Sequence, residues 1–456
     1  MEPFSPVLQR FIAKRPISVM ARATMERLFD ADAINTLFEA TAERQYTREL
    51  SFAHVVGLMN DVVFGVAPSV HASYQQRAEE IAVSSAALYQ KLNGIEPRVC
   101  SALVRYSHEE LASVLRASDA GTGEWLSGYR VKIVDGNHLS ATEHRLKELR
   151  QEWDAALPGK AVVILDAATM SISDVYVNED GHSQECEQIP ALLDRVEASE
   201  LWLADRHYST LGMMMGVAER GACFLIRQHG AFKPQPLSER VFVGKTETGK
   251  VYQQEVRIGK HDRQLQVRRI TVELDTPTRN AEREIHLLTN VPEEDAKADH
   301  LSLLYLKRWT IEQAFFDLTT CLQCEIKTLG YPKAALFTFT LALVAYNIVS
   351  LIKAIIRRVH GPEAVDEQIS PYYLALEIRQ SYDGMTIVVD EHEWRGFQQL
   401  SPQAFAQILK TIAAKVNIAR YRKHKRGPKK KPPKKKPYVN GSHLSTAKLI
   451  ASRDAP

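Results

Sequence analysis

The sequence is poor in cysteine, with five in 456 residues. This number is odd and too small for a protein built on disulfides, so we expect a reducing environment inside a cell. The first thirty residues contain no apolar run of the length that a signal peptide needs. Hydrophobic residues make up 45% and charged residues 25% of the chain, which excludes a disordered or fibrous protein. The length favours two to four domains, at roughly 100–200 residues per domain.

Long apolar runs are also scarce, since the sequence has one, at residues 334–352. Its 19 residues match the length of a membrane span, so a transmembrane helix is the alternative to a buried core helix. The run is interrupted by the polar residues Thr338, Thr340, Asn347 and Ser350. No second run of this kind exists, so we expect a buried helix of a soluble protein that does not use a membrane.

Positive charge is concentrated near the C-terminus. Between Arg420 and Lys436 there are 11 Lys and Arg residues and no acid, although the net charge of the chain is only +3. Such a block predicts a nucleic-acid partner bound with a steep salt dependence, whereas a merely solubilising tail is the alternative. The cations that we expect to contact DNA here are Arg420, Arg422, Lys423, Lys425, Arg426, Lys429, Lys430 and Lys431.

The hydrophobic pattern divides the chain into four parts. Residues 1–125 have helical periodicity, and residues 360–418 are helical again. Between them, residues 126–359 alternate strands with helices, which is typical of an α/β fold with a mixed sheet. A β-rich insertion is expected at about residues 230–283, and 285–289 is expected to return to the main sheet. Residues 419–456 form a basic, proline-rich tail that we expect to be largely disordered.

Three acids are placed where they could bind a metal ion. Asp135 and Asp205 each follow a predicted strand, at 129–134 and 200–204, and Glu312 lies inside a predicted helix. Carboxylate oxygens are the ligands that Mg²⁺ and Mn²⁺ prefer. Asp166 also follows a strand and is the alternative for the first position.

The residues around Glu312 suggest a surface that faces phosphate. At about 100° per residue, Tyr305, Arg308 and Glu312 fall on one side of a single helix. The Arg fork can bind two phosphate oxygens and the Tyr hydroxyl can donate to a third. An ordinary surface pair of Arg308 with Glu312 is the alternative.

Three blocks carry a family resemblance: 134–139 (VDGNHL), 204–208 (ADRHY) and 305–312 (YLKRWTIE). In this order and spacing they resemble the DD-E transposases of the insertion-sequence 4 family, whose catalytic domain has the ribonuclease H-like fold. The third block looks like the family's Tyr-x2-Arg-x3-Glu-x6-Lys signature, and the β-rich insertion also resembles that of the family. One residue departs from the signature, because Thr319 stands where the family has a lysine that contacts DNA.

The resemblance implies the roles of the candidate residues. Asp135, Asp205 and Glu312 would be the catalytic residues of a two-metal mechanism and the ligands of its Mg²⁺ ions, for which Mn²⁺ can substitute. Tyr305 and Arg308 would contact phosphate. Trp309, in the same helix, would either stack on a displaced base or pack in the core.

The resemblance also implies a function, namely that of a bacterial, cytoplasmic DNA transposase acting as an endonuclease and strand-transferase. It would cleave double-stranded DNA at terminal inverted repeats and join the 3′-hydroxyl ends to target DNA, as a homodimer on DNA. Residues 1–125 would recognise the ends. A non-catalytic, regulatory relative and a metal-dependent nuclease are the alternatives.

Two further features have ordinary explanations. Cys321 and Cys324 form a lone CxxC without a second pair, so two core cysteines are expected rather than a zinc site. His138 and His207 lie close to the proposed ligands, and each is expected either to support them or to be an ordinary surface or core histidine.

Overall fold

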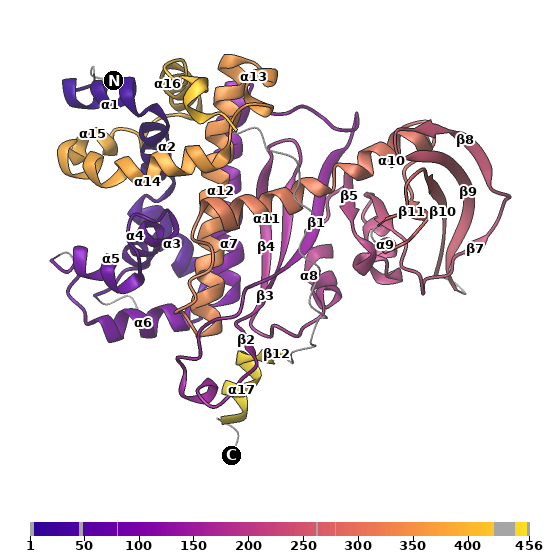
Figure 1. Cartoon of the computed structure of the whole chain (residues 1–456), viewed down its shortest axis with the longest axis horizontal. Coiled ribbons are helices and arrows are strands. Elements are labelled where there is room, and N and C mark those ends of the chain that lie inside the picture. Colours follow the sequence, from indigo (N-terminus) through magenta and orange to yellow (C-terminus); the bar gives the residue numbers. More distant parts are fainter. Residues whose placement is uncertain are drawn as a thin grey trace.

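The computed structural model describes residues 4–44, 49–79, 81–260, 263–278, 280–423 and 443–453 (Figure 1). A helical part made from both ends of the chain lies on one side of a large mixed sheet. The far end of this sheet is formed by long, strongly curved strands (Figure 1). The mixed α/β fold class is therefore as expected from the sequence.

The N-terminal part is helical, and its helices start at residues suited to that position. Ser51 and Ser84 each accept a hydrogen bond from a backbone N–H in the first turn of the helix that follows. Pro97 occupies the first position of the longest of these helices, where its missing N–H costs nothing. The helices are α1 (Pro6–Lys14), α2 (Pro16–Leu28), α3 (Ala31–Thr41), α4 (Phe52–Val63), α5 (Val70–Gln76), α6 (Ser85–Gly94) and α7 (Pro97–Ser118).

The sheet has ten strands, in the order β4-β3-β1-β5-β6-β11-β10-β9-β7, with β8 paired to β9. The strands are β1 (Arg130–His138), β3 (Lys160–Asp166), β4 (Ser171–Asn178), β5 (Glu200–Ala204), β6 (Cys223–Arg227), β7 (Gln235–Pro236), β8 (Val241–Thr246), β9 (Gly249–Lys260), β10 (Arg263–Leu274) and β11 (Glu284–Thr289). A separate pair joins β2 (Ala155–Leu157) to β12 (His443–Ser445).

The first five strands of the sheet have the arrangement of a ribonuclease H-like core. β4, β3 and β1 are antiparallel, whereas β1, β5 and β6 run parallel. β11 then pairs antiparallel with β6, which confirms that the chain returns to the main sheet after the insertion. The strands of the insertion continue this sheet, because β10 pairs with β11 and β9 pairs with β10.

The remaining helices cover both faces of the sheet and complete the helical part. They are η1 (Lys147–Leu149), η2 (Glu185–Gln188), α8 (Ile189–Leu193), η3 (Arg206–Tyr208), α9 (Leu211–Glu219), α10 (Ala298–Leu306), α11 (Trp309–Cys321), α12 (Pro332–His360), α13 (Pro362–Asp366), α14 (Pro371–Val388), α15 (Glu391–Arg395), α16 (Pro402–Ala413), η4 (Ile418–Tyr421) and α17 (Thr446–Arg453).

Alternate residues of β1 face two different cores. Val131 and Ile133 belong to the large core that contains α7 and α12. Val134, on the opposite face, belongs to a smaller core with Ile189 of α8 and Met213 of α9. Successive side chains of a strand point to opposite faces of the sheet, so the position of a residue in β1 decides which helices it contacts.

α12 is the long apolar helix expected from the sequence, and it is a core helix. By length and composition it could cross a membrane, but 83% of its most apolar window is buried inside the protein. Asn347 in its middle accepts a hydrogen bond from the backbone N–H of Ile172 (2.7 Å) and donates to the carbonyl of the same residue (2.8 Å). It also donates to Ser107 of α7 (3.2 Å), so this polar side chain fixes α12 against β4 and α7.

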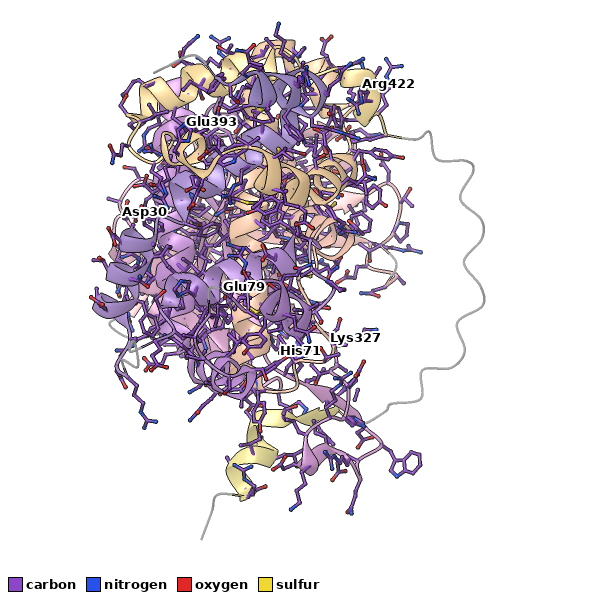
Figure 2. All side chains as sticks on the ribbon, turned by 90° about the vertical axis from the view of Figure 1, so that its left-hand side faces the viewer. Asp30, His71, Glu79, Lys327, Glu393 and Arg422 are labelled. Atoms are coloured by element: carbon purple, nitrogen blue, oxygen red, sulfur yellow. The ribbon has the colours of Figure 1, made fainter. Side chains whose placement is uncertain are left out.

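The C-terminal segment differs from the predicted disordered tail. β12 pairs with β2 in parallel, and α17 is held by ion pairs from Lys448 to Asp180 (2.8 Å) and from Arg453 to Glu148 (2.9 Å). The segment after the basic block forms these contacts through a short strand and the cations Lys448 and Arg453, which composition alone did not reveal. Figure 2 shows that Arg422, before the basic block, and helix α17 (yellow), after it, lie at opposite ends of the molecule.

Asp166, the alternative to Asp135, lies on β3 directly opposite Lys132 of β1. It forms an ion pair with Lys132 (2.6 Å), and both side chains are about 5% exposed. Burial opposes ionisation of Asp166, but the attraction of Lys132 outweighs it and lowers the pKa of the carboxyl to about 2. The pair therefore stabilises the fold above the ordinary pKa of an aspartate, near 4, and this contribution is lost as the pH falls towards 2.

Replacing Asp166 by Asn should destabilise the protein by about 3–5 kcal/mol at pH 7, because Lys132 would keep a buried charge without a partner. Urea denaturation measures this loss, which should shrink below pH 4. Asp194→Asn is the control, since that side chain is 79% exposed and its ion pair is long (3.9 Å). Equal stability of both variants at pH 7 would contradict the prediction.

Candidate active site

Asp135 and Asp205 lie side by side because the pairing of two parallel strands stops immediately before them. The last residues paired between β1 and β5 are Val134 and Ala204, so each aspartate is the next residue along its chain. β1 itself does not end there, contrary to the sequence prediction. It continues to His138 because β3 goes on pairing with it on the other side. Asp135 therefore lies inside β1, at a position where β1 is paired with β3 but no longer with β5.

Asp205 is held by the turn that follows it. Its Oδ1 accepts a hydrogen bond from the backbone N–H of His207 (2.8 Å), which caps the short helix η3. Its Oδ2 lies 2.9 Å from Nδ1 of the same histidine. Of the two histidines considered, His207 is the one that contacts Asp205, whereas His138 lies at the exposed end of β1.

The helix that carries Glu312 is interrupted, which corrects the prediction of one continuous helix. α10 ends at Leu306 and α11 begins at Trp309. Around Lys307 and Arg308 the backbone bonds span three residues instead of four, as the N–H groups of Thr310 and Ile311 donate to the carbonyls of Lys307 and Arg308. This tightening turns Arg308 towards the sheet from the junction of two helices.

Arg308 joins two of the three predicted ligands. Its Nη1 donates to Oδ2 of Asp135 (3.1 Å), and its Nη2 donates to Oε1 of Glu312 (2.6 Å). The residue is only 9% exposed, so the alternative of an ordinary surface pair is wrong. Tyr305 attaches α10 to the same corner, since its hydroxyl donates to the carbonyl of Ala204 (3.2 Å).

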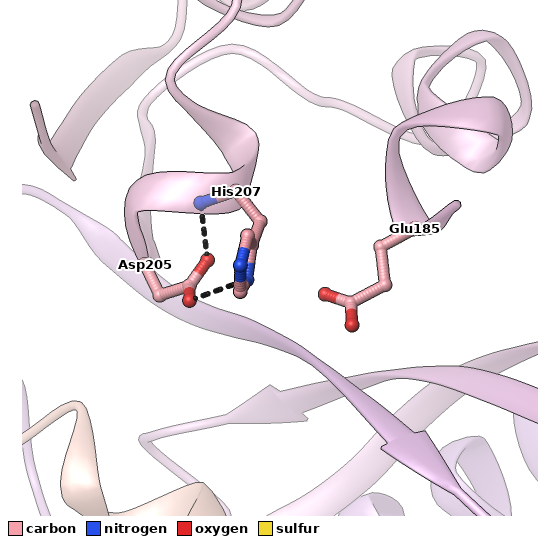
Figure 3. Close-up of side chains that lie close together, drawn as sticks. All are labelled: Glu185, Asp205 and His207. Atoms are coloured by element: carbon pink, nitrogen blue, oxygen red, sulfur yellow. Dashed lines mark hydrogen bonds and ion pairs between the residues drawn. The ribbon is translucent and has the colours of Figure 1, made fainter. Parts of the chain in front are cut away.

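Glu185 is a residue of this corner that the sequence did not identify. Donor atoms of Glu185, Asp205 and His207 all lie within 4.8 Å of one another (Figure 3). Glu185 lies at the start of a short helical segment, in which η2 begins at Glu185 and α8 ends at Leu193. No local signal separates Glu185 from the neighbouring Glu187, because only the packing of η2 against the sheet brings it here.

The crowding of acids affects the protonation of Asp135. Burial is the largest cause that raises the pKa of this carboxyl to about 6. Arg308 lowers the pKa, whereas the negative charges of Asp205, Glu185 and Glu312 raise it further. Four carboxylates are therefore close enough to repel one another, which is an arrangement that a bound cation would relieve.

Three observations fit this corner to a divalent cation. The donors are carboxylate oxygens, which hard cations prefer. Burial and the charges of Glu185, Asp135 and Asp205 raise the pKa of the buried Tyr208 hydroxyl well above its ordinary value, so negative charge is concentrated in this corner. Gly136 leaves room for Glu185, whose carboxyl a Cβ at this position would overlap. Asp135, Asp205, Glu312 and Glu185 are the residues that could hold the ion.

The other candidate residues lie around this corner or away from it. Trp309 is 65% exposed, so packing in the core is excluded for it. Thr319 is also exposed, and its hydroxyl donates to backbone carbonyls of its own helix. Cys321 and Cys324 are free and buried, in agreement with two core cysteines.

The predicted basic contacts are only partly within the described residues. Arg420 donates to the carbonyl of Lys14 (2.9 Å), Arg422 to the side chain of Gln368 (2.9 Å), and Lys423 to the carbonyl of Asp366 (2.8 Å). The predicted contacts that lie outside the described residues are Lys425, Arg426, Lys429, Lys430 and Lys431.

The pKa of Asp135 predicts a gain in stability from removing its charge. Because folding raises this pKa to about 6, ionisation between pH 4 and 6 opposes the folded state. Asp135→Asn should thus raise the free energy of unfolding by about 1–3 kcal/mol at pH 8. Denaturation in a chelator measures this, and the gain should vanish below pH 4. A less stable variant at pH 8 would mean that the bond to Arg308 outweighs the cost of burial.

Comparisons with known proteins find similarity over part of the chain. A search of curated protein sequences finds no significant match. A solved structure, the cryo-EM structure of the piggyBac transposase synaptic complex with hairpin DNA, is similar with a TM-score of 0.39 and 9% identity over 87% of this chain and 85% of that one. Residues 126–348, which run from the start of the β1 region into α12 and include Asp135, Asp205 and Glu312, match the family model of the transposase DDE domain.

Proposed function

We propose that the protein is a DNA transposase whose active centre is formed by Asp135, Asp205 and Glu312. The observation that carries the proposal is the convergence of these acids from two neighbouring strands and a later helix, with Asp135 and Glu312 both bonded to Arg308. It is supported by the match of this segment to the transposase DDE domain. Membership of the insertion-sequence 4 family is part of the same proposal.

The reaction is a pair of displacements at phosphorus. In the first, a water oxygen attacks the phosphodiester at the transposon end, the bond from phosphorus to the 3′ oxygen breaks, and that oxygen leaves with a proton as a 3′-hydroxyl. In the second, this hydroxyl attacks a phosphodiester of the target, a new bond to phosphorus forms, and the target's own 3′ oxygen leaves. Bound Mg²⁺ or Mn²⁺ would polarise the phosphate and lower the pKa of the attacking hydroxyl.

The residues of the chain prepare the site for such ions and for a phosphate. Asp135 and Asp205 present oxygens from the point where two strands separate, and Glu312 approaches from the first turn of α11. Arg308 neutralises part of their charge in the free protein. When cations take over that role, its guanidinium becomes available to phosphate, which is the contact that we assign to it together with Tyr305.

The DNA would lie across the exposed side of α11. Trp309 projects there with 65% of its surface exposed, beside the buried Arg308. An exposed aromatic ring next to a phosphate site suits stacking on an unpaired base. We assign end recognition to the N-terminal helices and propose that two copies act together, since two transposon ends must be joined.

The triad predicts which substitutions abolish cleavage. Asp135→Asn, Asp205→Asn and Glu312→Gln should each lower strand cleavage more than about 100-fold, because loss of a ligand removes several kcal/mol of charge stabilisation. The assay uses a labelled DNA that carries the flanking inverted repeat, with Mg²⁺ or with EDTA, and measures binding of the same DNA in parallel.

The matched control for this assay is Asp317→Asn, because Asp317 lies on α11 but pairs with Gln313 (2.8 Å) away from the triad. Full cleavage by any triad variant would remove that residue from the active centre. Specific binding by the wild type without cleavage in either metal would favour a regulatory protein, and cleavage that ignores the repeat would leave a nuclease.

Trp309 gives a separate prediction about DNA binding. Trp309→Ala should weaken binding to a DNA end with unpaired bases by roughly 10-fold, since base stacking contributes about 1–3 kcal/mol. Its stability should change by no more than about 0.5 kcal/mol, because the ring is mostly exposed. Fluorescence anisotropy measures the affinity, with Trp153→Ala (98% exposed) as the control. Equal affinities of the two variants would refute the stacking role.

A further inference from the structure

A cavity of about 200 Å³ lies between α7 and the sheet, and its described lining includes no acid of the candidate active site. Lys132 of β1, Ile164 of β3 and Trp202 of β5 line it from the sheet. α7 lies beside the edge strand β4 and contributes the other side (Figure 1). Because Ile164 and Trp202 belong to the smaller core, the cavity borders apolar packing, which strengthens the attraction between opposite charges placed in it.

Lys132 reaches the cavity because of its position in β1. Side chains of a strand alternate between the two faces of the sheet, so Lys132 lies on the same face as Val134 of the smaller core. Its partner in the register of β5 is Trp202, and it is only 4% exposed. A buried ammonium group needs negative charge close by, and Asp166 supplies it (2.6 Å). Lys132 therefore brings a desolvated cation to the wall of the cavity.

α7 presents one stripe of side chains to the cavity. Its members follow one another at spacings of three and four residues, which places them on one side of the helix: Arg105, His108, Ala112 and Arg116. Ala112 stands between the two arginines, and its short side chain leaves space there. Arg105 forms an ion pair with Asp174 of β4 (3.2 Å).

Cations outnumber the buried carboxylates around this space. The cations that line it are Arg105, Arg116, Arg130, Lys132 and Arg195. The buried carboxylates that line it or pair with its lining are Asp166, Asp174 and Glu200. Five cations against three carboxylates leave an excess of two positive charges. Two further lining acids, Glu109 and Glu197, are exposed, so water and salt screen their charges.

The buried carboxylates of the lining are already satisfied by nearby donors. Asp174 accepts hydrogen bonds from the guanidinium of Arg105 (3.2 and 3.4 Å). Glu200 accepts from the indole of Trp202 (2.9 Å) and from the backbone N–H of Glu197 (3.0 Å). Burial raises the pKa of Glu200, which favours its neutral form and adds to the positive excess.

Two guanidinium groups therefore stay available to a ligand that enters from solvent. Arg195, which follows α8, lies 4.0 Å from Asp174, beyond hydrogen-bond distance. Arg116 is exposed, and its side chain forms no hydrogen bond or ion pair with any residue in the described part of the chain. Each guanidinium offers a planar fork of N–H donors, which matches the oxygens of a phosphate group.

We propose that this cavity binds a phosphate dianion, either as inorganic phosphate or as the phosphate of a nucleoside 5′-monophosphate. Such a group carries about −1.5 to −2 charges at pH 7, which matches the excess of two cations. A phosphodiester within a DNA strand carries one charge and has a sugar on each side, so it suits an enclosed cavity less well. The site goes beyond the proposed function and does not depend on it.

Titration calorimetry of the full chain tests the site. Sodium phosphate and deoxyadenosine 5′-monophosphate are titrated separately in EDTA, with deoxyadenosine as the probe that lacks a phosphate. Both phosphates should bind saturably, and deoxyadenosine should not. Tighter binding of the nucleotide would identify it as the ligand, and equal affinities would identify the phosphate ion, so that either result supports the site.

Two arginines of α7 provide a matched pair of variants. Arg116→Gln should weaken phosphate binding at least about 10-fold, because it removes a charge-assisted hydrogen bond. Arg98→Gln is the control, since this side chain is 45% exposed and pairs with Glu43 and Glu96 instead. It should bind phosphate as the wild type does.

A second variant, Ala112→Leu, fills the space between the arginines and leaves every cation in place. It should abolish phosphate binding, whereas unchanged binding would mean that the anion does not enter the cavity. Circular dichroism and thermal denaturation check the fold, and Ala112→Val replaces the leucine variant if that one does not fold.

Three further results would overturn the site. The first is the absence of saturable binding of either phosphate by the wild type. The second is equal weakening by Arg116→Gln and Arg98→Gln, since the anion would then respond only to overall surface charge. The third is a loss in Arg308→Gln but not in Arg116→Gln, which would place the anion in the proposed active centre. The transposase function is decided separately by the cleavage assay.

Discussion

Repulsion between carboxylates is the constraint on which the architecture of the site depends. Burial and, to a smaller extent, the negative charges of Asp205, Glu185 and Glu312 raise the pKa of Asp135 to about 6, although Arg308 acts in the opposite direction. A folded protein that keeps four such groups together accepts a loss of stability. The guanidinium fork limits that loss by bonding Asp135 and Glu312 at once. The free protein is thereby held in a geometry that a cation can enter with little rearrangement.

The sheet supplies the rigidity that such an arrangement needs. Pairing of β1 with β5 stops at Val134 and Ala204, and this single feature sets two aspartates at the same level. Pairing of β1 with β3 continues, so the backbone of Asp135 stays fixed while its carboxyl accepts a hydrogen bond from Arg308. Gly136 then leaves room for the carboxyl of Glu185, which a Cβ at this position would overlap. The two faces, one packed on α12 and the other on α9, therefore contribute to one site.

In the core behind the site, a polar side chain within an apolar helix fixes the position of that helix against the sheet. Asn347 bonds both backbone groups of Ile172 and thus fixes where along β4 the long helix α12 lies. A purely apolar helix would have several positions of similar energy against the sheet. Such a bond costs little when it is complete and much when it is broken, so it selects one position.

The sequence by itself determined the elements and the main candidates. Periodicity identified β5 and the buried helix α12, and the three motif blocks selected Asp135, Asp205 and Glu312, because those signals are local. Contacts between distant segments were decided only by the tertiary structure. Glu185 and Glu187 look alike in the sequence, and only the docking of η2 beside Gly136 makes the former a neighbour of Asp205. The pairing of β12 with β2 is equally hidden, since burial and charge balance arise only when segments far apart in the chain meet.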